Sequence, residues 1–110
     1  MTRVYAQGDV TFIPVAGPLP AEATPLPQEQ GRFIFAHGEV TGHHHSTLPR
    51  PGVTYAEAQG VRYLSIAELV GEVSVEHQEH RPVTLPPGLY EVRRQREATD
   101  TDEGWVNVAD

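Results

Sequence analysis

The chain has 110 residues, no cysteine, and a formal net charge of −7 from 15 acidic and 8 basic residues. This length predicts a single domain over residues 1–110, and the lack of cysteine excludes disulfides and thiolate metal sites. The negative charge disfavours duplex DNA and anionic membranes as partners. No apolar stretch approaches the ~20 residues that span a bilayer, and no signal-peptide core is present, so we expect a cytoplasmic protein.

Ten prolines and ten glycines interrupt the chain too often for a long helix. We therefore expect an all-β fold, a small antiparallel barrel or sandwich with little or no helix. Residues 9–15 form the first predicted strand. Residues 16–31 are a proline-rich loop that cannot belong to a central strand. Residues 32–36 form a second strand that leads toward the histidines.

The middle of the chain predicts a hairpin. Residues 53–58 and 61–66 alternate as strands do, and Gln59-Gly60 supplies the turn between them. A short helical turn is expected at residues 65–69. After it, Val73 and Val75 share one strand face, and the same alternation places His77 on that face.

The last part of the chain is expected to start with a turn at residues 86–88, where Gly88 is free to take a positive φ. Residues 89–95 then form the last strong strand, with Tyr90 and Val92 on its core face. Residues 97–104 are acidic and expected to be mobile, and residues 105–108 could add a short strand.

Two short histidine clusters carry the functional signal. His43, His44 and His45 are consecutive, and in an extended segment His43 and His45 share a face while His44 points away. Imidazole is the commonest protein metal ligand, and it suits Zn, Fe and Ni. We therefore expect His43 and His45 to lie close to His77 and to bind a metal with it.

His80 extends the second cluster but needs a turn or bulge to join the others, which Arg81-Pro82 can supply. Glu76 and Glu79 are candidate ligands or acceptors that fix an imidazole tautomer. The predicted metal ligands are thus His43, His45, His77 and His80, with the first three as the easier set. His37 and His44 are more typical of residues that pack against neighbours or expose the end of the ring to solvent.

Four blocks of the sequence resemble a family of small bacterial and phage-encoded proteins that carry them in the same order. The blocks are Gln7-Gly8-Asp9-Val10, Gly38-Glu39-Val40-Thr41-Gly42-His43-x-His45, His77-x-Glu79-His80 and Leu85-Pro86-Pro87-Gly88-x-Tyr90-x-Val92-x-x-Gln95-Arg96-Glu97. The resemblance implies that the four predicted ligands are the shared histidines. It implies no mechanism.

A weaker resemblance is to cupins, small β-barrels that hold a metal through a Gly-rich His-x-His motif and have a later Pro-x-Gly turn. Gly38, His43, His45 and residues 86–88 occur in a comparable order, which implies a cupin-like barrel. The chain departs from that pattern at Pro49 and Arg50, where a ligand glutamate is expected, and no histidine follows the turn.

The remaining polar motifs give candidates for catalysis. Arg96 could hold an oxyanion, and Glu79 could act as a base. Arg93, Arg94 and Arg96 could hold one phosphate, although charged residues are also typical of an edge strand kept soluble. No nucleophile elbow accompanies the serines, and glycine loops that cradle phosphate are absent.

Three hypotheses follow from these residues. The first is a metal-dependent enzyme of unknown substrate, with zinc foremost and Fe or Ni as alternatives, and an open coordination position. The second is a structural metal-binding or interaction module closed by four histidines. The third is a metal-free histidine acid–base site that acts on a phosphodiester. Homo-oligomer formation is compatible with all three.

Overall fold

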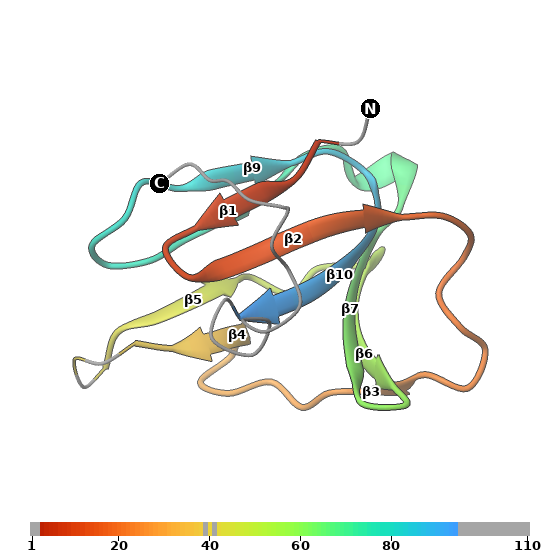
Figure 1. Cartoon of the computed structure of the whole chain (residues 1–110), viewed down its shortest axis with the longest axis horizontal. Helices are drawn as coiled ribbons and strands as arrows, with labels where there is room; N and C mark the ends of the chain where they lie inside the picture. Colours follow the sequence, from red (N-terminus) through yellow and green to blue (C-terminus); the bar gives the residue numbers. More distant parts are fainter. Residues whose placement is uncertain (1–2, 39, 41, 95–110) are drawn as a thin grey trace.

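The computed structural model describes residues 3–38, 40 and 42–94, whose strands form two layers of antiparallel sheet (Figure 1). The larger layer is a six-stranded sheet in the order β1-β2-β10-β7-β6-β3, and the pairs β4–β5 and β8–β9 form the other. The elements are β1 (Tyr5–Gln7), β2 (Val10–Val15), β3 (Thr24–Pro25), β4 (Phe33–His37), β5 (His44–Thr47), β6 (Val53–Ala58), β7 (Val61–Ile66), η1 (Glu68–Val70), β8 (Val73–Val75), β9 (Val83–Leu85) and β10 (Gly88–Arg94). The predicted all-β fold is confirmed, as an open sandwich and not a closed barrel.

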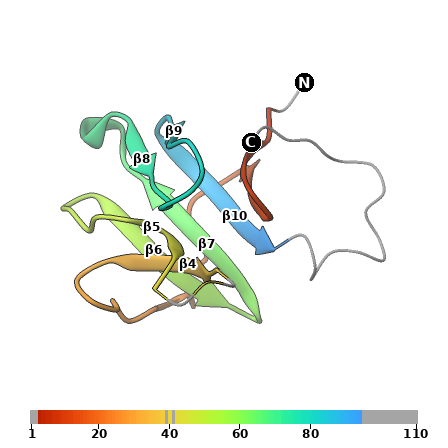
Figure 2. The same ribbon diagram turned by 90° about the vertical axis from the view of Figure 1, so that its left-hand side faces the viewer.

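The smaller layer is continuous through one backbone bridge between its two strand pairs. Ser46 of β5 and Glu76, directly after β8, exchange two hydrogen bonds, with N···O distances of 3.0 and 2.8 Å. The bridge places the end of β8 beside β5 (Figure 2). Since His77 follows Glu76, this bridge brings the second histidine cluster to the first.

The core lies between the two layers. Phe12 and Phe35 meet edge to face at a ring-centre distance of 5.1 Å, and Phe35 meets Tyr55 in the same way at 5.0 Å. These rings come from β2, β4 and β6, so they join both layers. Burial of such apolar surface is the main stabilising term in a domain of this size. The sandwich is thus held by a packed core that does not include the histidines.

The predicted hairpin is confirmed at β6 and β7. Gln59 and Gly60 have φ values of 55° and 81°, as both central residues of a type I′ turn require. The proline-rich loop also behaves as predicted, because its only described strand is the two-residue β3 at the sheet edge. Pro25 lacks an N–H and can take that edge position.

β10 agrees with the prediction for its core face but not for its place in the sheet. Tyr90 and Val92 are buried, and Gly88 has a φ of 149°. However, β10 lies between β2 and β7, so Arg93 and Arg94 do not belong to an edge strand, and that interpretation is wrong. The reason is that both neighbours come from much earlier in the chain, which local patterning does not reveal.

Further expectations concern helices and the end of the chain. The helical turn is the 3-10 helix η1, which starts later than predicted because β7 continues to Ile66. No helix in the described part of the chain is long and apolar enough to span a membrane. The acidic segment 97–104 and the predicted strand 105–108 lie outside the described residues.

Candidate functional site

Four imidazoles gather where the β1–β2 turn, the start of β5 and the loop after β8 meet. The ring centre of His77 lies 4.3 Å from that of His45, 4.7 Å from that of His80 and 5.9 Å from that of His43. The rings of His45 and His80 stack at 5.8 Å. We call His43, His45, His77 and His80 the histidine cluster. The two sequence clusters therefore lie together, as the alternation of side chains predicted.

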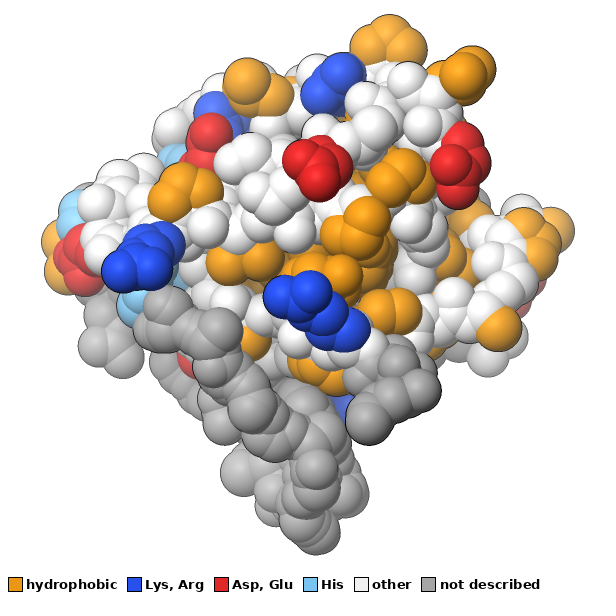
Figure 3. Space-filling view, turned by 90° about the horizontal axis from the view of Figure 1, so that it is seen from above, with side chains coloured by type: hydrophobic (Ala, Val, Ile, Leu, Met, Phe, Trp, Pro, Cys, Tyr) orange, Lys and Arg blue, Asp and Glu red, His pale blue; other side chains and the backbone are white. Residues whose placement is uncertain are grey.

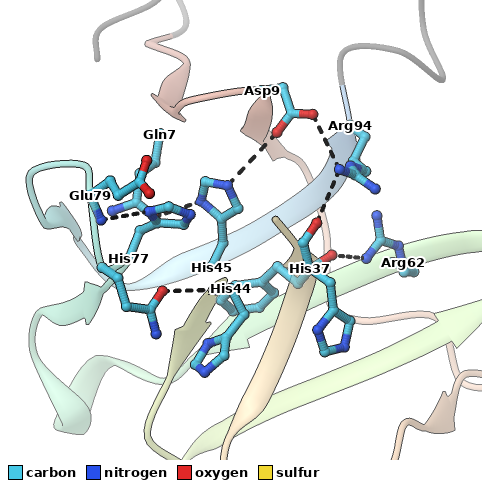
Figure 4. Close-up of polar contacts among 11 residues, drawn as sticks. Gln7, Asp9, His37, His44, His45, Arg62, His77, Glu79 and Arg94 are labelled. Carbon is cyan, nitrogen blue, oxygen red and sulfur yellow. Dashed lines mark hydrogen bonds and ion pairs between the residues drawn. The ribbon is translucent and has the colours of Figure 1, made fainter. Parts of the chain in front are cut away.

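His45 is the buried centre of the histidine cluster, and a buried glutamine fixes its tautomer. The side chain of Gln7 is fully buried, and its Nε2 donates to the carbonyl oxygens of Val75 at 2.9 Å and Arg81 at 2.8 Å. Because carbonyls only accept, the amide nitrogen must face them and Oε1 must face His45. The Nδ1 of His45 lies 2.9 Å from that oxygen and so carries the proton (Figure 4). The Nε2 of neutral His45 therefore keeps a free lone pair.

A carboxylate lies beside that lone pair. Asp9 Oδ1 is 3.7 Å from His45 Nε2, too far for a hydrogen bond, while its Oδ2 is 3.4 Å from Arg94 Nη2. Arg94 also donates to the carbonyl oxygen of His37 at 3.2 Å. The ion pair thus ties the start of β2 to the end of β10 and holds Asp9 at the border of the histidine cluster.

The other side of the histidine cluster carries Glu79. Its backbone N–H donates to Nδ1 of His77 at 2.9 Å, so neutral His77 carries its proton on Nε2. Its carboxylate Oε2 lies 2.8 Å from Nδ1 of His43, although the contact does not meet hydrogen-bond geometry. The side chain of Glu79 is 54% exposed and that of His43 is 27% exposed. Some histidine side chains reach the molecular surface in Figure 3. The site is therefore open to solvent on this side.

The imidazoles at the centre are held neutral. Burial, and then the neighbouring His77, lower the pKa of His45 to about 4, an effect that Asp9 only partly opposes. Burial and His80 also lower the pKa of His77. Desolvation disfavours the charged form of an imidazole, and like charges add to that effect. Near neutral pH both rings are thus uncharged, and that of His45 has a free lone pair on Nε2.

Gly8 allows the β1–β2 turn to approach the rings. Its φ is 58°, and a Cβ placed there would lie 2.9 Å from His80 Nε2 and 3.1 Å from His45 Cε1. Positive φ costs a non-glycine residue about 1–2 kcal/mol. We expect Gly8→Ala to lower the free energy of unfolding by about that amount and to push the partly exposed His80 ring off His45, as ring-proton NMR shifts would report.

Gly17→Ala is the matched control for this prediction. Gly17 has a φ of 85°, and a Cβ placed there would meet no atom of the described residues within 4 Å. The two variants should lose a similar unfolding free energy, because both carry the backbone strain, but only Gly8→Ala should shift the His80 and His45 ring signals. Unchanged ring signals in Gly8→Ala would contradict the close approach.

The sequence did not identify every residue of the site. Gln7 and Asp9 belong to it, and the signal for them was the Gln7-Gly8-Asp9-Val10 block, which had no assigned role. His44 points away from the histidine cluster, as predicted, and its ring faces His37. Glu79 lies in the site, whereas the catalytic candidate Arg96 lies outside the described residues.

The donor atoms are not arranged as a finished metal site. Within residues 3–38, 40 and 42–94, no three His, Asp or Glu side chains already converge on one ion position. For His77 the reason is visible, since its Nδ1 is occupied by the Glu79 N–H and its Nε2 carries the proton. Metal ligation by His77 would require loss of that hydrogen bond, and ligation through Nε2 would also require a change of tautomer.

Comparison with known proteins gives one match. The family model described as Domain of unknown function (DUF8820) matches residues 6–95. Neither a curated protein nor a solved structure gives a significant match. The matched residues include the β1–β2 turn, the two histidine-containing segments 43–45 and 77–80, and β10. The match leaves the resemblance to cupins unconfirmed.

Proposed function

The chain belongs to the Domain of unknown function (DUF8820) family, and from its site alone we propose that the histidine cluster binds one divalent transition metal ion, zinc foremost, with Fe or Ni as alternatives. The observation that carries this proposal is the state of His45. A buried, neutral imidazole has its Nδ1–H held by Gln7 and its Nε2 lone pair free beside the carboxylate of Asp9, while the rings of His77 and His80 lie 4.3 and 5.8 Å from its own ring centre.

The hydrogen bond that Gln7 Oε1 accepts from His45 Nδ1 has the form expected of an outer partner that supports a metal ligand. Ligating histidines usually donate their second N–H to a carboxylate or carbonyl oxygen, which fixes the ring and its tautomer. Gln7 supplies that oxygen, and two backbone carbonyls fix Gln7 in turn. His45 is thus held in place before any ion arrives.

The spacing of the rings also supports zinc. Imidazoles bound tetrahedrally through nitrogens at zinc distances would have ring centres about 5 Å apart. The ring-centre distances in the histidine cluster run from 4.3 to 5.9 Å. Rotation of the partly exposed rings of His43 and His80 would then be enough to bring their nitrogens to one ion, while His77 would also have to give up the hydrogen bond from the Glu79 N–H. His45 would remain the fixed ligand.

The charges around the cluster favour a cation. Asp9 and Glu79 flank it on opposite sides, and the central rings are neutral near neutral pH. The exposed side at Glu79 leaves room for an open coordination position, as in an enzyme. A bound zinc ion there would activate water for hydrolysis, and Glu79 is the carboxylate placed to accept a proton.

A metal-free acid–base site is the second candidate, favoured by the contact of His43 with Glu79 at 2.8 Å and by the tautomer of His77. A carboxylate beside an imidazole is a common acid–base arrangement. Action of this site on a phosphodiester is less supported, because the arginines predicted to hold the phosphate are paired with carboxylates. Arg93 lies 3.5 Å from Glu91, and Arg94 lies 3.4 Å from Asp9. A phosphate would have to compete with those carboxylates.

Zinc titration of the purified protein tests the proposal. We expect a tight site with one equivalent of Zn²⁺ that stabilises the fold by about 3 kcal/mol at a hundredfold excess over Kd. His45→Ala should abolish the tight site, and His77→Asn, at a more exposed position, covers the case in which His45→Ala fails to fold. Gln28→Ala, on an exposed loop, is the control and should bind as the wild type.

The contrary outcomes are specific. An unchanged zinc isotherm in His77→Asn and His45→Ala would overturn the metal proposal. Hydrolysis of bis(p-nitrophenyl) phosphate that persists in chelator and is lost in His43→Ala would favour the acid–base site instead. Because the core is separate from the histidines, we expect chelated protein to remain folded. Unfolding by chelator would favour the structural module.

A further inference from the structure

A second histidine pair lies on the opposite side of the β4–β5 hairpin. His37 and His44 are directly paired in the strand register, and their ring centres are 6.4 Å apart. Both side chains point away from His45 and His77 (Figure 4). Glu29, from the loop before β4, places its Oε1 3.0 Å from His37 Nε2. Two imidazoles and one carboxylate therefore lie near one another outside the histidine cluster, although they do not yet converge on one ion position in the described residues.

His44 is prepared to act as a ligand. Its backbone N–H donates to Gln78 Oε1 at 2.8 Å, which fixes the start of β5. Its Nδ1 is buried and has no hydrogen-bond partner among the described residues. Burial and the nearby Arg32 lower the pKa of His44, so the ring is neutral near pH 7. The charge of Arg32 is itself offset by Glu76, 2.6 Å away.

The site is accessible from solvent. The side chain of His37 is 61% exposed, and that of Glu29 is 51% exposed. His44 is partly exposed. Directly paired residues of an antiparallel sheet have Cβ atoms about 4.5–5.5 Å apart, which is close enough for two imidazoles to share one ion. Rotation of the exposed His37 ring would close the remaining gap between the rings.

We propose that His37, His44 and Glu29 form a second site for a divalent transition metal ion such as Zn²⁺, exposed and separate from the histidine cluster. Three ligands leave further coordination positions to water or to an added ligand. The strand period explains how one strand serves both sites, because His43 and His45 face inward while His44 faces outward. The exposed position makes this the weaker and faster-exchanging of the two sites.

Zinc titration followed by ¹⁵N NMR of the histidine rings tests this site. We expect the His37 and His44 nitrogens to shift with Zn²⁺ in a second, weaker phase. His44→Ala should abolish the response of His37 to Zn²⁺, and Glu29→Gln, which removes the carboxylate charge but keeps the size, should weaken it about tenfold. Glu68→Gln, another exposed glutamate, controls for the lost charge.

The result is independent of the first proposal. In His77→Asn the His37 and His44 response should persist even if the histidine cluster no longer binds zinc, so failure of one site does not imply failure of the other. The second site is overturned if the His37 and His44 rings ignore Zn²⁺ at millimolar concentration. It is also overturned if they respond equally in wild type and Glu29→Gln.

Discussion

Replacing Gln7 with leucine is expected to lower the free energy of unfolding by about 3 kcal/mol or more, since each buried group that loses its partner costs about 1–3 kcal/mol. The change keeps the approximate size of the side chain but removes three hydrogen bonds. These bonds join the carbonyl of Val75, the carbonyl of Arg81 and the Nδ1–H of His45 to one amide. Urea unfolding at neutral pH would measure the loss.

Gln28→Leu is the matched control, because Gln28 is exposed and the same substitution there removes no buried hydrogen bond. Its effect should stay within about 0.5 kcal/mol. Gln7→Leu should also weaken zinc binding by about 10–100-fold, the usual range for loss of an outer partner of a ligand. A Gln7→Leu protein as stable as Gln28→Leu would mean that the three hydrogen bonds of the Gln7 amide do not stabilise the fold.

The second large effect is a loss of stability in mild acid, caused by His45. Its pKa is lowered to about 4 in the folded protein from 6.5 in the unfolded chain. Between these values the unfolded state binds more protons, so stability is full above pH 6.5 and falls as the pH drops toward 4. The shift corresponds to about 3 kcal/mol at its limit. The lowered pKa values of His44 and His77 act in the same direction.

This dependence should be measured by urea unfolding of chelated protein from pH 7.5 to 4.5, so that competition with metal does not contribute. His45→Gln should flatten the slope between pH 6.5 and 5, where few carboxylates titrate. Direct NMR titration of the His45 ring covers the case in which that variant is unstable, and its midpoint should lie well below 6.5. A midpoint near 6.5 would refute the neutral, buried state on which the metal proposal rests.

The two predictions examine the same arrangement from different sides. Gln7→Leu removes the acceptor that selects the tautomer of His45, while acid protonates the nitrogen that the tautomer leaves free. If both hold, His45 is a preorganised neutral base or ligand. The choice between metal binding and metal-free catalysis then rests on the zinc titration.

Much of the fold follows from local pattern. Proline and glycine excluded long helices, and Gln59-Gly60 located the hairpin because few dipeptides accept two positive φ values. The period of a strand also separated His43 and His45 from His44, and it placed His77 with the first two. These are properties of neighbouring residues, so the sequence alone determined them.

The tertiary structure alone decided which distant segments meet. Gln7 bonds to His45 across 38 positions and to Val75 across 68, and nothing near Gln7 in the sequence signals either partner. The central place of β10 is of the same kind, because strand order depends on how whole layers pack. The sequence thus determined the chemistry of the donors and the faces they occupy. Packing of the two layers decided the tautomer, burial and charge state of His45, since these depend on neighbours that only the folded chain supplies.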